Sequence, residues 1–137
     1  GPEGGSAAAL LLRKLCALEE LNLASNRDLG AEGINELAGR SDSGLALRIL
    51  DLSACGLEGV SGCRAVARLL CRTPSLEQIG LSNNALGAAG LESLLAELPH
   101  LITLTSANLG YCQLQGEEGA QAAAALAAKL CMPDAAV

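Results

Sequence analysis

The chain has 137 residues, half of them hydrophobic, and its 15 acidic residues outnumber its 9 lysines and arginines, which gives a net charge of −6. This length predicts a single domain, and the acidic charge disfavours direct binding to nucleic acid. No run of about 18 apolar residues is present, so the sequence predicts neither a transmembrane helix nor a membrane partner.

The segment before Leu18 precedes the regular pattern. Gly1-Pro2 is typical of the remnant of a cleaved tag, and residues 1–6 are predicted to form a flexible leader. Residues 7–17 are largely apolar and predict the outer helix of a truncated preceding repeat. A secretory signal is the weaker alternative, because no basic segment precedes the apolar stretch. A start in mid-repeat favours a piece of a longer protein.

From Leu18 onward, leucine recurs at a nearly constant spacing. The pattern Leu-x-x-Leu-x-Leu begins at Leu18, Leu47 and Leu76, and a related copy begins at Leu104. Apolar residues at alternate positions predict a short strand in each copy. Four copies at one period predict a solenoid, in which each repeat contacts only its neighbours.

A residue of one of two types follows each strand, where the chain turns away from the sheet. These residues, which we call the turn ladder, are Asn26, Cys55, Asn84 and Cys112. We expect their side chains to hydrogen-bond backbone groups of the turns that would otherwise be buried and unpaired.

The segments between the strands carry one-sided apolar stripes, which predict helices covered on one face. The stripe residues are Ile34, Leu37 and Ala38; Val60, Cys63, Val66, Ala67 and Leu70; Leu91, Leu94, Leu95 and Leu98; and Leu126 and Leu130 among the alanines of residues 117–130. Because a helix packs wider than a strand, the stack must curve. The predicted fold is an α/β solenoid, a horseshoe segment with a parallel β-sheet on the concave side and α-helices on the convex side.

These residues resemble a leucine-rich-repeat protein of the ribonuclease-inhibitor subtype. That subtype has repeats of about 28 or 29 residues and alternates Asn-type with Cys-type copies, as the turn ladder does. The Asn-type copies here share Leu-Gly-Ala-x-Gly at residues 29–33 and 86–90, and the Cys-type copies share a later glycine at Gly62 and Gly119. The resemblance covers residues 7–131 and implies four repeats over residues 18–131, followed by a tail at 132–137.

Two features depart from a regular array. The first turn contains an extra residue between Asn26 and Leu29. The fourth repeat has two frames, because residues 99–104 also match residues 74–79, which would start the repeat at Leu101. We prefer the start at Leu104, since Cys112, Leu114 and Gly119 then take their expected positions.

Six cysteines are present: Cys16, Cys55, Cys63, Cys71, Cys112 and Cys131. Cys55 and Cys112 lie two repeats apart, about 10 Å at the usual strand spacing, which is too far for a disulfide. No Cys-x-x-Cys motif occurs. We therefore predict buried, reduced thiols and an intracellular protein, cytoplasmic and/or nuclear. The cysteines and other ligands are too dispersed for a zinc site.

No pattern predicts catalysis. His100 is the only histidine and no nucleophile or orienting group accompanies it. Residues 87–90 lack the lysine of a phosphate-binding loop. The sequence therefore predicts no catalytic, cofactor-binding or metal-binding residue and a protein that is not an enzyme. Arg64, Arg68 and Arg72 share one helix face, which is predicted to be solvated; a local patch for an acidic partner is the alternative.

The outward-facing strand positions define the expected binding surface. Its residues are Glu20, Asn22, Ile49, Asp51, Gln78 and Asn108, with Tyr111 on the rim. This surface is small, polar and mildly acidic, and it lacks the tryptophans and arginines that usually anchor interfaces. We therefore expect either another protein with a basic surface, or binding through a rim or a repeat end.

The leading functional hypothesis is a non-catalytic protein-interaction module, a scaffold segment of a larger multidomain intracellular protein. The resemblance implies hosts such as nucleotide-binding innate-immune receptors or Tonsoku-like repair scaffolds. A GTPase-activating or enzyme-inhibitor domain of the same class is the first alternative, supported by family analogy alone. A structural segment that caps a longer solenoid is the second.

Overall fold

The computed structural model describes residues 18–40, 46–97 and 104–129. The leader, the helix predicted over residues 7–17 and the tail at 132–137 lie outside the described residues. The same holds for Cys16, Leu98, His100, Leu130 and Cys131.

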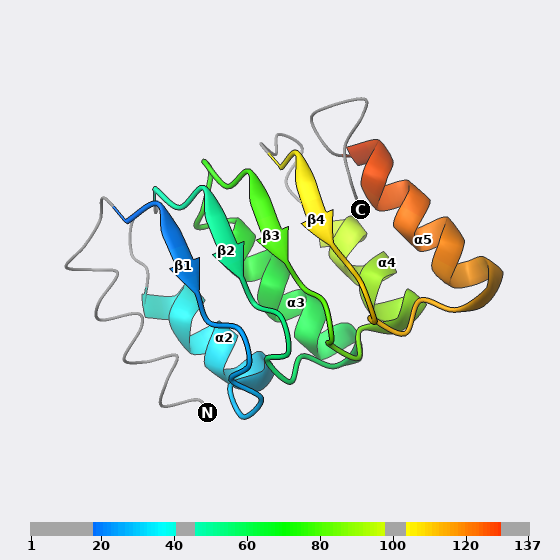
Figure 1. The fold of residues 1–137 in the computed structure, drawn as a ribbon, viewed down its shortest axis with the longest axis horizontal. Helices are drawn as coiled ribbons and strands as arrows, with labels where there is room; N and C mark the ends of the chain where they lie inside the picture. The colour runs from blue at the N-terminus through cyan, green and yellow to red at the C-terminus, as the bar shows by residue number, and fades with distance from the viewer. Residues whose placement is uncertain (1–17, 41–45, 98–103, 130–137) are drawn as a thin grey trace.

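Strands and helices alternate along the chain. The elements are β1 (Glu20–Asn22), α2 (Gly30–Arg40), β2 (Ile49–Asp51), α3 (Gly59–Leu70), β3 (Gln78–Gly80), α4 (Gly87–Glu97), β4 (Ser106–Asn108) and α5 (Gly116–Lys129). The four strands form one parallel sheet in the order β1-β2-β3-β4. Figure 1 shows them side by side, with the helices of the described part of the chain together behind one face. The predicted α/β solenoid is confirmed.

The strand register follows the leucine grid. Leu21 pairs with Leu50, Leu50 with Ile79 and Ile79 with Ala107, so each pairing advances by one repeat. The last pairing places the fourth repeat in the frame that begins at Leu104. Backbone hydrogen bonds between neighbouring repeats continue beyond the strand ends, because the Leu52 N–H donates to the Gly80 carbonyl at 2.8 Å.

The core lies between the sheet and the helices. The middle residue of each of the last three strands is buried, at Leu50, Ile79 and Ala107. On the helix side of the core, the apolar stripes contribute the buried residues Leu37, Val66, Leu94 and Leu126. The core consists of aliphatic side chains and cysteines, and it is built in layers, one for each repeat.

Val60 corrects one predicted stripe. Its side chain is 39 % exposed, whereas Cys63, Val66, Ala67 and Leu70 of the same helix are buried. Val60 lies in the first turn of α3 and lines a hollow of the convex surface together with Arg64 and Glu97. The covered face of α3 therefore begins one turn later than predicted.

Close approach of neighbouring helices depends on Gly90. A Cβ added at Gly90 would lie 2.8 Å from the Gly59 carbonyl oxygen and 3.2 Å from Sγ of Cys63. Any larger residue would push α4 away from α3. This contact gives a physical reason for the glycine that ends the Leu-Gly-Ala-x-Gly segment of the third repeat.

Candidate protein-binding face

Asn84 joins two repeats through the turn ladder. Its Oδ1 accepts hydrogen bonds from the backbone N–H groups of Cys55 at 3.0 Å and Leu57 at 3.1 Å, both in the preceding repeat. Its Nδ2 donates to the carbonyls of Leu52 and Leu81, each at 2.9 Å. The side chain is 2 % exposed, so these bonds satisfy backbone groups that water does not reach.

The cysteines of the turn ladder each make one short and one longer contact with backbone carbonyls. Sγ of Cys55 donates to the Leu23 carbonyl and Sγ of Cys112 to the Leu81 carbonyl, both at 3.0 Å. A thiol is a weak donor and a weak acceptor. Each cysteine therefore contacts only carbonyls, whereas the Asn84 amide bonds two backbone N–H groups and three carbonyls. Burial raises the pKa of both thiols, which keeps them protonated and able to donate.

Asn26 occupies the same ladder position but lies in the exposed first turn. Its Nδ2 donates to the Leu23 carbonyl at 2.6 Å. The ladder therefore contains one interior asparagine and one at the surface, with similar chemistry in different surroundings.

The outward-facing residues of the four strands fall into two rows across the open face of the sheet. The first row is Glu20, Ile49, Gln78 and Ser106, and the second is Asn22, Asp51, Gly80 and Asn108. Glu20, Asn22, Gln78 and Asn108 are exposed, whereas Ile49 and Asp51 are half-buried. All but Ile49 and Gly80 are polar, and Glu20 and Asp51 are acidic.

Turn hydrogen bonds hold the side chains of the second row. Oδ1 of Asp51 accepts from the Ser53 N–H at 2.9 Å. Oδ1 of Asn22 accepts from the Ala24 N–H, and Oδ1 of Asn108 accepts from the Gly110 N–H. An Asx side chain bound to the N–H two residues ahead has few rotamers left, so these groups are positioned before any partner arrives.

A shallow hollow of about 300 Å³ lies on the last three strands, and its volume is bounded by both rows. Its lining residues are Ile49, Leu50, Asp51, Gln78, Ile79, Gly80, Ser106 and Asn108. Asp51 is the only charged residue among them. Gln78, Asn108 and Ser106 add amide and hydroxyl oxygens to the lining of the same hollow. Together with the carboxylate they form a set of acceptors suited to a cationic donor.

Gly80 creates the hollow because it has no side chain where its row neighbours carry Asp51 and Asn108. A Cβ added at Gly80 would lie 2.6 Å from Oδ1 of Asp51. The Asp51 carboxylate therefore leans over the glycine. Beyond it, the hydroxyls of Ser53 and Ser82 are 2.9 Å apart.

An ion-pair chain borders the face where the strands begin. Nε of Arg48 lies 2.7 Å from Oε2 of Glu77, and its Nη1 lies 3.8 Å from Oε1 of Glu19. The hydrogen bond to Glu77 and the attraction of that carboxylate raise the pKa of the guanidinium above its ordinary value. Arg48 thus neutralises one of the two flanking acids but leaves the border acidic.

The structure places the predicted face residues in different settings. Ile49, Asp51, Gln78 and Asn108 line the common hollow. Glu20 and Asn22 lie beside it on β1. Tyr111 is 85 % exposed in the turn after β4, and its φ of 56° puts it in the left-handed region.

Sequence reasoning did not single out Gly80, which lies two residues after Gln78 and therefore on the same face of the sheet. A glycine inside a strand is the signal that could have identified it, because such a position marks a close approach or a gap. The pairing of Arg48 with Glu77 was also not predicted. Their separation of 29 residues, one repeat period, was the available signal.

The cysteine prediction needs one correction. Cys55, Cys63 and Cys112 are buried and free, but Cys71 is free and exposed. Cys71 is the C-cap of α3, one residue past its last helical position, and lies outside the covered face. Among the described residues, no group of three or more histidines, cysteines and acids could hold a metal ion. Nor does this part of the chain contain a helix long and apolar enough to span a bilayer.

Comparison with known proteins finds several related sequences. A family model described as a leucine-rich repeat matches residues 14–38. Ribonuclease inhibitor from Sus scrofa is 42 % identical over 91 residues, which cover 66 % of this chain and 20 % of the inhibitor. Protein NLRC5 from Mus musculus is 34 % identical over 133 residues, which cover 97 % of this chain and 7 % of NLRC5. The chain thus spans about a fifth or less of the length of these relatives.

A solved structure shares the fold. A structure described as leiomodin-1 actin-binding site 2 aligns with a TM-score of 0.65, and the alignment covers 87 % of this chain and 70 % of the leiomodin chain. At 13 % sequence identity, this likeness concerns the fold alone.

Proposed function

We propose a protein-binding function for this chain, which is a leucine-rich-repeat protein of the ribonuclease-inhibitor-like type. In the proposal, the open face of the sheet docks a basic segment of another protein. A lysine or arginine side chain of that segment enters the hollow above Gly80 and pairs with Asp51. The observation that supports this proposal most strongly is the oriented carboxylate of Asp51 next to Gly80, which has no side chain.

The charge distribution supports a basic partner. Asp51 is the only charged residue among the described residues that line the hollow. Where the strands begin, the three acids Glu19, Glu20 and Glu77 outnumber the single Arg48. The carboxylate is half-buried and already oriented by the Ser53 N–H. A cationic side chain therefore meets an acceptor that loses little freedom on binding, which favours affinity.

The hollow supports an inserted side chain over a flat contact. Its volume of about 300 Å³ is at the lower end of small-ligand sites, and its lining combines polar groups with the half-buried Ile49 side chain as an apolar contact. The long aliphatic stem of lysine or arginine can pack on such residues while its charged end reaches an acid. Neighbouring strand positions would contact the rest of the segment.

The wider setting is also part of the proposal. Alignment of nearly the whole chain with 7 % of NLRC5 supports a segment of a larger multidomain scaffold or receptor. Free buried thiols support a reducing, intracellular compartment, cytoplasmic or nuclear. The segment would act by binding, without catalysis, nucleic-acid binding or membrane contact, with Glu20, Asn22 and Tyr111 as flanking contacts.

The test uses a fluorescent peptide of alternating lysine and alanine and measures its affinity by anisotropy. Asp51→Asn keeps the Oδ1 acceptor for Ser53 but removes the charge, so we expect binding about tenfold weaker, equivalent to roughly 1.4 kcal/mol. Asp51→Lys combined with Glu20→Lys should abolish binding. Asp28→Asn, an equal charge change in the exposed first turn, is the matched control. Equal affinities for the wild type and the Asp51 variants would refute the concave site.

A second candidate is an enzyme-inhibitor role, which the 42 % identity to ribonuclease inhibitor favours. It predicts that the chain lowers the activity of a ribonuclease in a simple turnover assay. Unchanged ribonuclease activity at a large excess of the chain would remove this candidate and leave the docking proposal intact. The capping alternative predicts self-association, which light scattering measures.

A further inference from the structure

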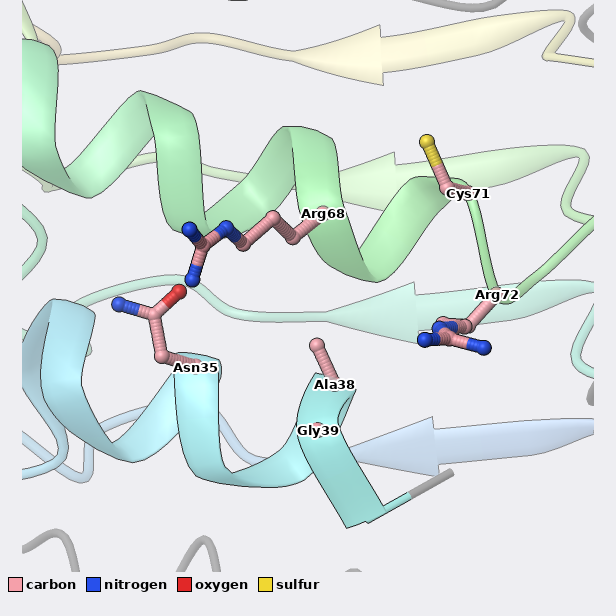
Figure 2. Close-up of a pocket in the computed structure, with 6 residues that line it drawn as sticks. All are labelled: Asn35, Ala38, Gly39, Arg68, Cys71 and Arg72. Carbon is pink, nitrogen blue, oxygen red and sulfur yellow. The ribbon is translucent and has the colours of Figure 1, made fainter. Parts of the chain in front are cut away.

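A second surface feature lies on the opposite side of the molecule, between α2 and α3. We call it the convex groove. Its first part is a hollow of about 460 Å³ lined by Asn35, Ala38, Gly39, Arg68, Cys71 and Arg72. Figure 2 shows Arg68 reaching from α3 toward Asn35 on α2, and Arg72 extending from the loop that follows α3.

The groove continues along α3. An adjoining hollow of about 540 Å³ shares Asn35 and Arg68 with the first and adds Val60, Ser61, Arg64 and Glu97. The two together follow α3 from its first turn to the residue after its C-cap. At 1.5 Å per helical residue this length is about 18 Å, enough for an extended peptide of about five residues.

Charge in the groove is opposite to that of the chain. The net charge is −6, yet the described residues that line the first hollow include two guanidinium groups and no carboxylate. Arg48 and Arg64 are paired with Glu77 and Glu97. No ion pair joins Arg68 or Arg72 to a carboxylate of a described residue, although like charges four positions apart repel each other.

Asn35 supplies a second, independent observation. Its Oδ1 is buried and has no hydrogen-bond partner among the described residues. A buried acceptor without a donor is unfavourable unless something supplies one. The groove thus offers two cationic donors beside one acceptor, which complements a chain that carries carboxylates and backbone N–H groups.

The spacing of the arginines selects the form of the ligand. Cys71 keeps helical dihedrals, φ −66° and ψ −18°, so Arg68 and Arg72 start about 6 Å apart along the axis. Residues i and i+2 of an extended strand point to the same side and are separated by a nearly equal distance, about 6.8 Å. Alternate acidic residues of an extended segment can therefore face the two guanidiniums in turn.

We propose that the convex groove binds an extended acidic segment of another protein, with carboxylates two residues apart on Arg68 and Arg72 and a backbone N–H on Asn35. The chain would then bind two partners of opposite charge, a basic one on the sheet and an acidic one on the helices. The groove does not depend on the concave site, so each proposal can fail alone.

Two fluorescent peptides with the same composition test the spacing by anisotropy with the full chain. Their sequences are GEAEAG, with in-phase carboxylates, and GEEAAG, with adjacent ones. We expect the in-phase peptide to bind about threefold more tightly, because only it places both carboxylates on one side. Equal affinity for the two peptides would overturn the proposal.

Arginine variants test the location. Arg68→Gln combined with Arg72→Gln should weaken binding of GEAEAG about tenfold, from two exposed charge pairs of about threefold each. Arg27→Gln, an equal charge change in the first turn, should leave binding within about twofold. If the double variant loses its helical circular dichroism, Arg72→Gln alone serves, because that residue lies outside α3. Unchanged affinity in the folded variants would overturn the proposal.

Cys71 reports occupancy of the groove independently. In a background in which Cys16 and Cys131 are serine, saturating GEAEAG should slow alkylation of Cys71 by iodoacetamide, and GEEAAG should slow it less at the same concentration. Alkylation that is unaffected by bound peptide would place the peptide elsewhere and contradict the proposal. A wild-type dimer in sedimentation that Arg68→Gln with Arg72→Gln dissociates would show that a second copy occupies the groove, which would overturn the choice of partner.

Discussion

Replacing Asn84 by alanine tests the turn ladder most sharply. The change removes two acceptor bonds, from the N–H groups of Cys55 and Leu57, and leaves both donors buried without a partner. It also removes the donor bonds to the carbonyls of Leu52 and Leu81. Each orphaned buried N–H costs about 1–3 kcal/mol, so Asn84→Ala should lower the free energy of unfolding by about 3–5 kcal/mol.

Asn26→Ala is the matched control at the same ladder position. Asn26 is exposed, and its bonds go to carbonyls in the same exposed turn, where water can replace the amide. Asn26→Ala should therefore lower the free energy of unfolding by about 1 kcal/mol or less. The two variants differ in burial and in how many repeats the side chain connects.

Urea unfolding followed by far-UV circular dichroism measures both costs. The chain has no tryptophan and a single tyrosine, so helical signal is a better probe than fluorescence. At about 1–3 kcal/mol per molar urea, the predicted loss for Asn84→Ala moves the midpoint down by roughly 1–5 M. Equal costs for Asn84→Ala and Asn26→Ala would refute the role of Asn84 in joining the repeats.

Substitutions that keep part of the chemistry refine the test. Asn84→Asp retains the acceptor but loses both donors and sets a charge against backbone carbonyls, so it should be at least as destabilising as alanine. The thiol of Asn84→Cys can donate to one carbonyl, as those of Cys55 and Cys112 do. The free energy of unfolding of this variant should therefore lie between those of the wild type and Asn84→Ala.

Other predictions concern packing and the thiols. Gly90→Ala should lower the free energy of unfolding by about 1–3 kcal/mol, because its Cβ would meet the Gly59 carbonyl at 2.8 Å; Gly39→Ala, with nothing within 4 Å of the new Cβ, should raise it by about 0.5–1 kcal/mol in the same urea experiment. Burial raises the pKa of the Cys63 thiol from 9.0 to about 12, so the folded state retains a proton that the unfolded chain releases. The stability supplied by the neutral thiol is therefore complete below pH 9 and is lost as the pH rises toward 12; urea midpoints across this range should fall less steeply in Cys63→Ala, and identical slopes would contradict the assignment. Among the described cysteines, only Cys71 should react with iodoacetamide in the native protein, which peptide mass mapping checks; rapid native alkylation of Cys63 would show that the α3 face is open.

The repeat grid predicted the sheet well because each inward strand position is a large aliphatic residue and each turn has its own ladder residue. Leu21, Leu50 and Ile79 could pair in only one register without moving polar residues into the core. Helices α3 and α4 followed from their stripes for the same reason. Val60 was misplaced because periodicity identifies a face but not where a neighbouring element stops covering it.

The binding surfaces were harder to predict because they depend on how side chains of neighbouring repeats are directed and on where one repeat lacks a side chain or an ion-pair partner. The grid placed Asp51 and Gly80 on the same face, but a close approach of 2.6 Å between them is a matter of side-chain direction. Likewise, the periodicity put Arg64, Arg68 and Arg72 on one helix face. The three arginines differ in their ion pairing, because Glu97 of α4 lies 3.4 Å from Arg64 and pairs with it rather than with Arg68 or Arg72.

Backbone amide mapping by nuclear magnetic resonance tests the proposed docking face most directly. A uniformly ¹⁵N-labelled chain is titrated with the lysine–alanine peptide, and chemical-shift changes are followed residue by residue. The changes should cluster at Asp51, Ser53, Gly80 and Asn108 and should weaken in Asp51→Asn. Changes confined to α2 and α3, or an unaltered pattern in Asp51→Asn, would contradict a basic segment bound in the hollow above Gly80.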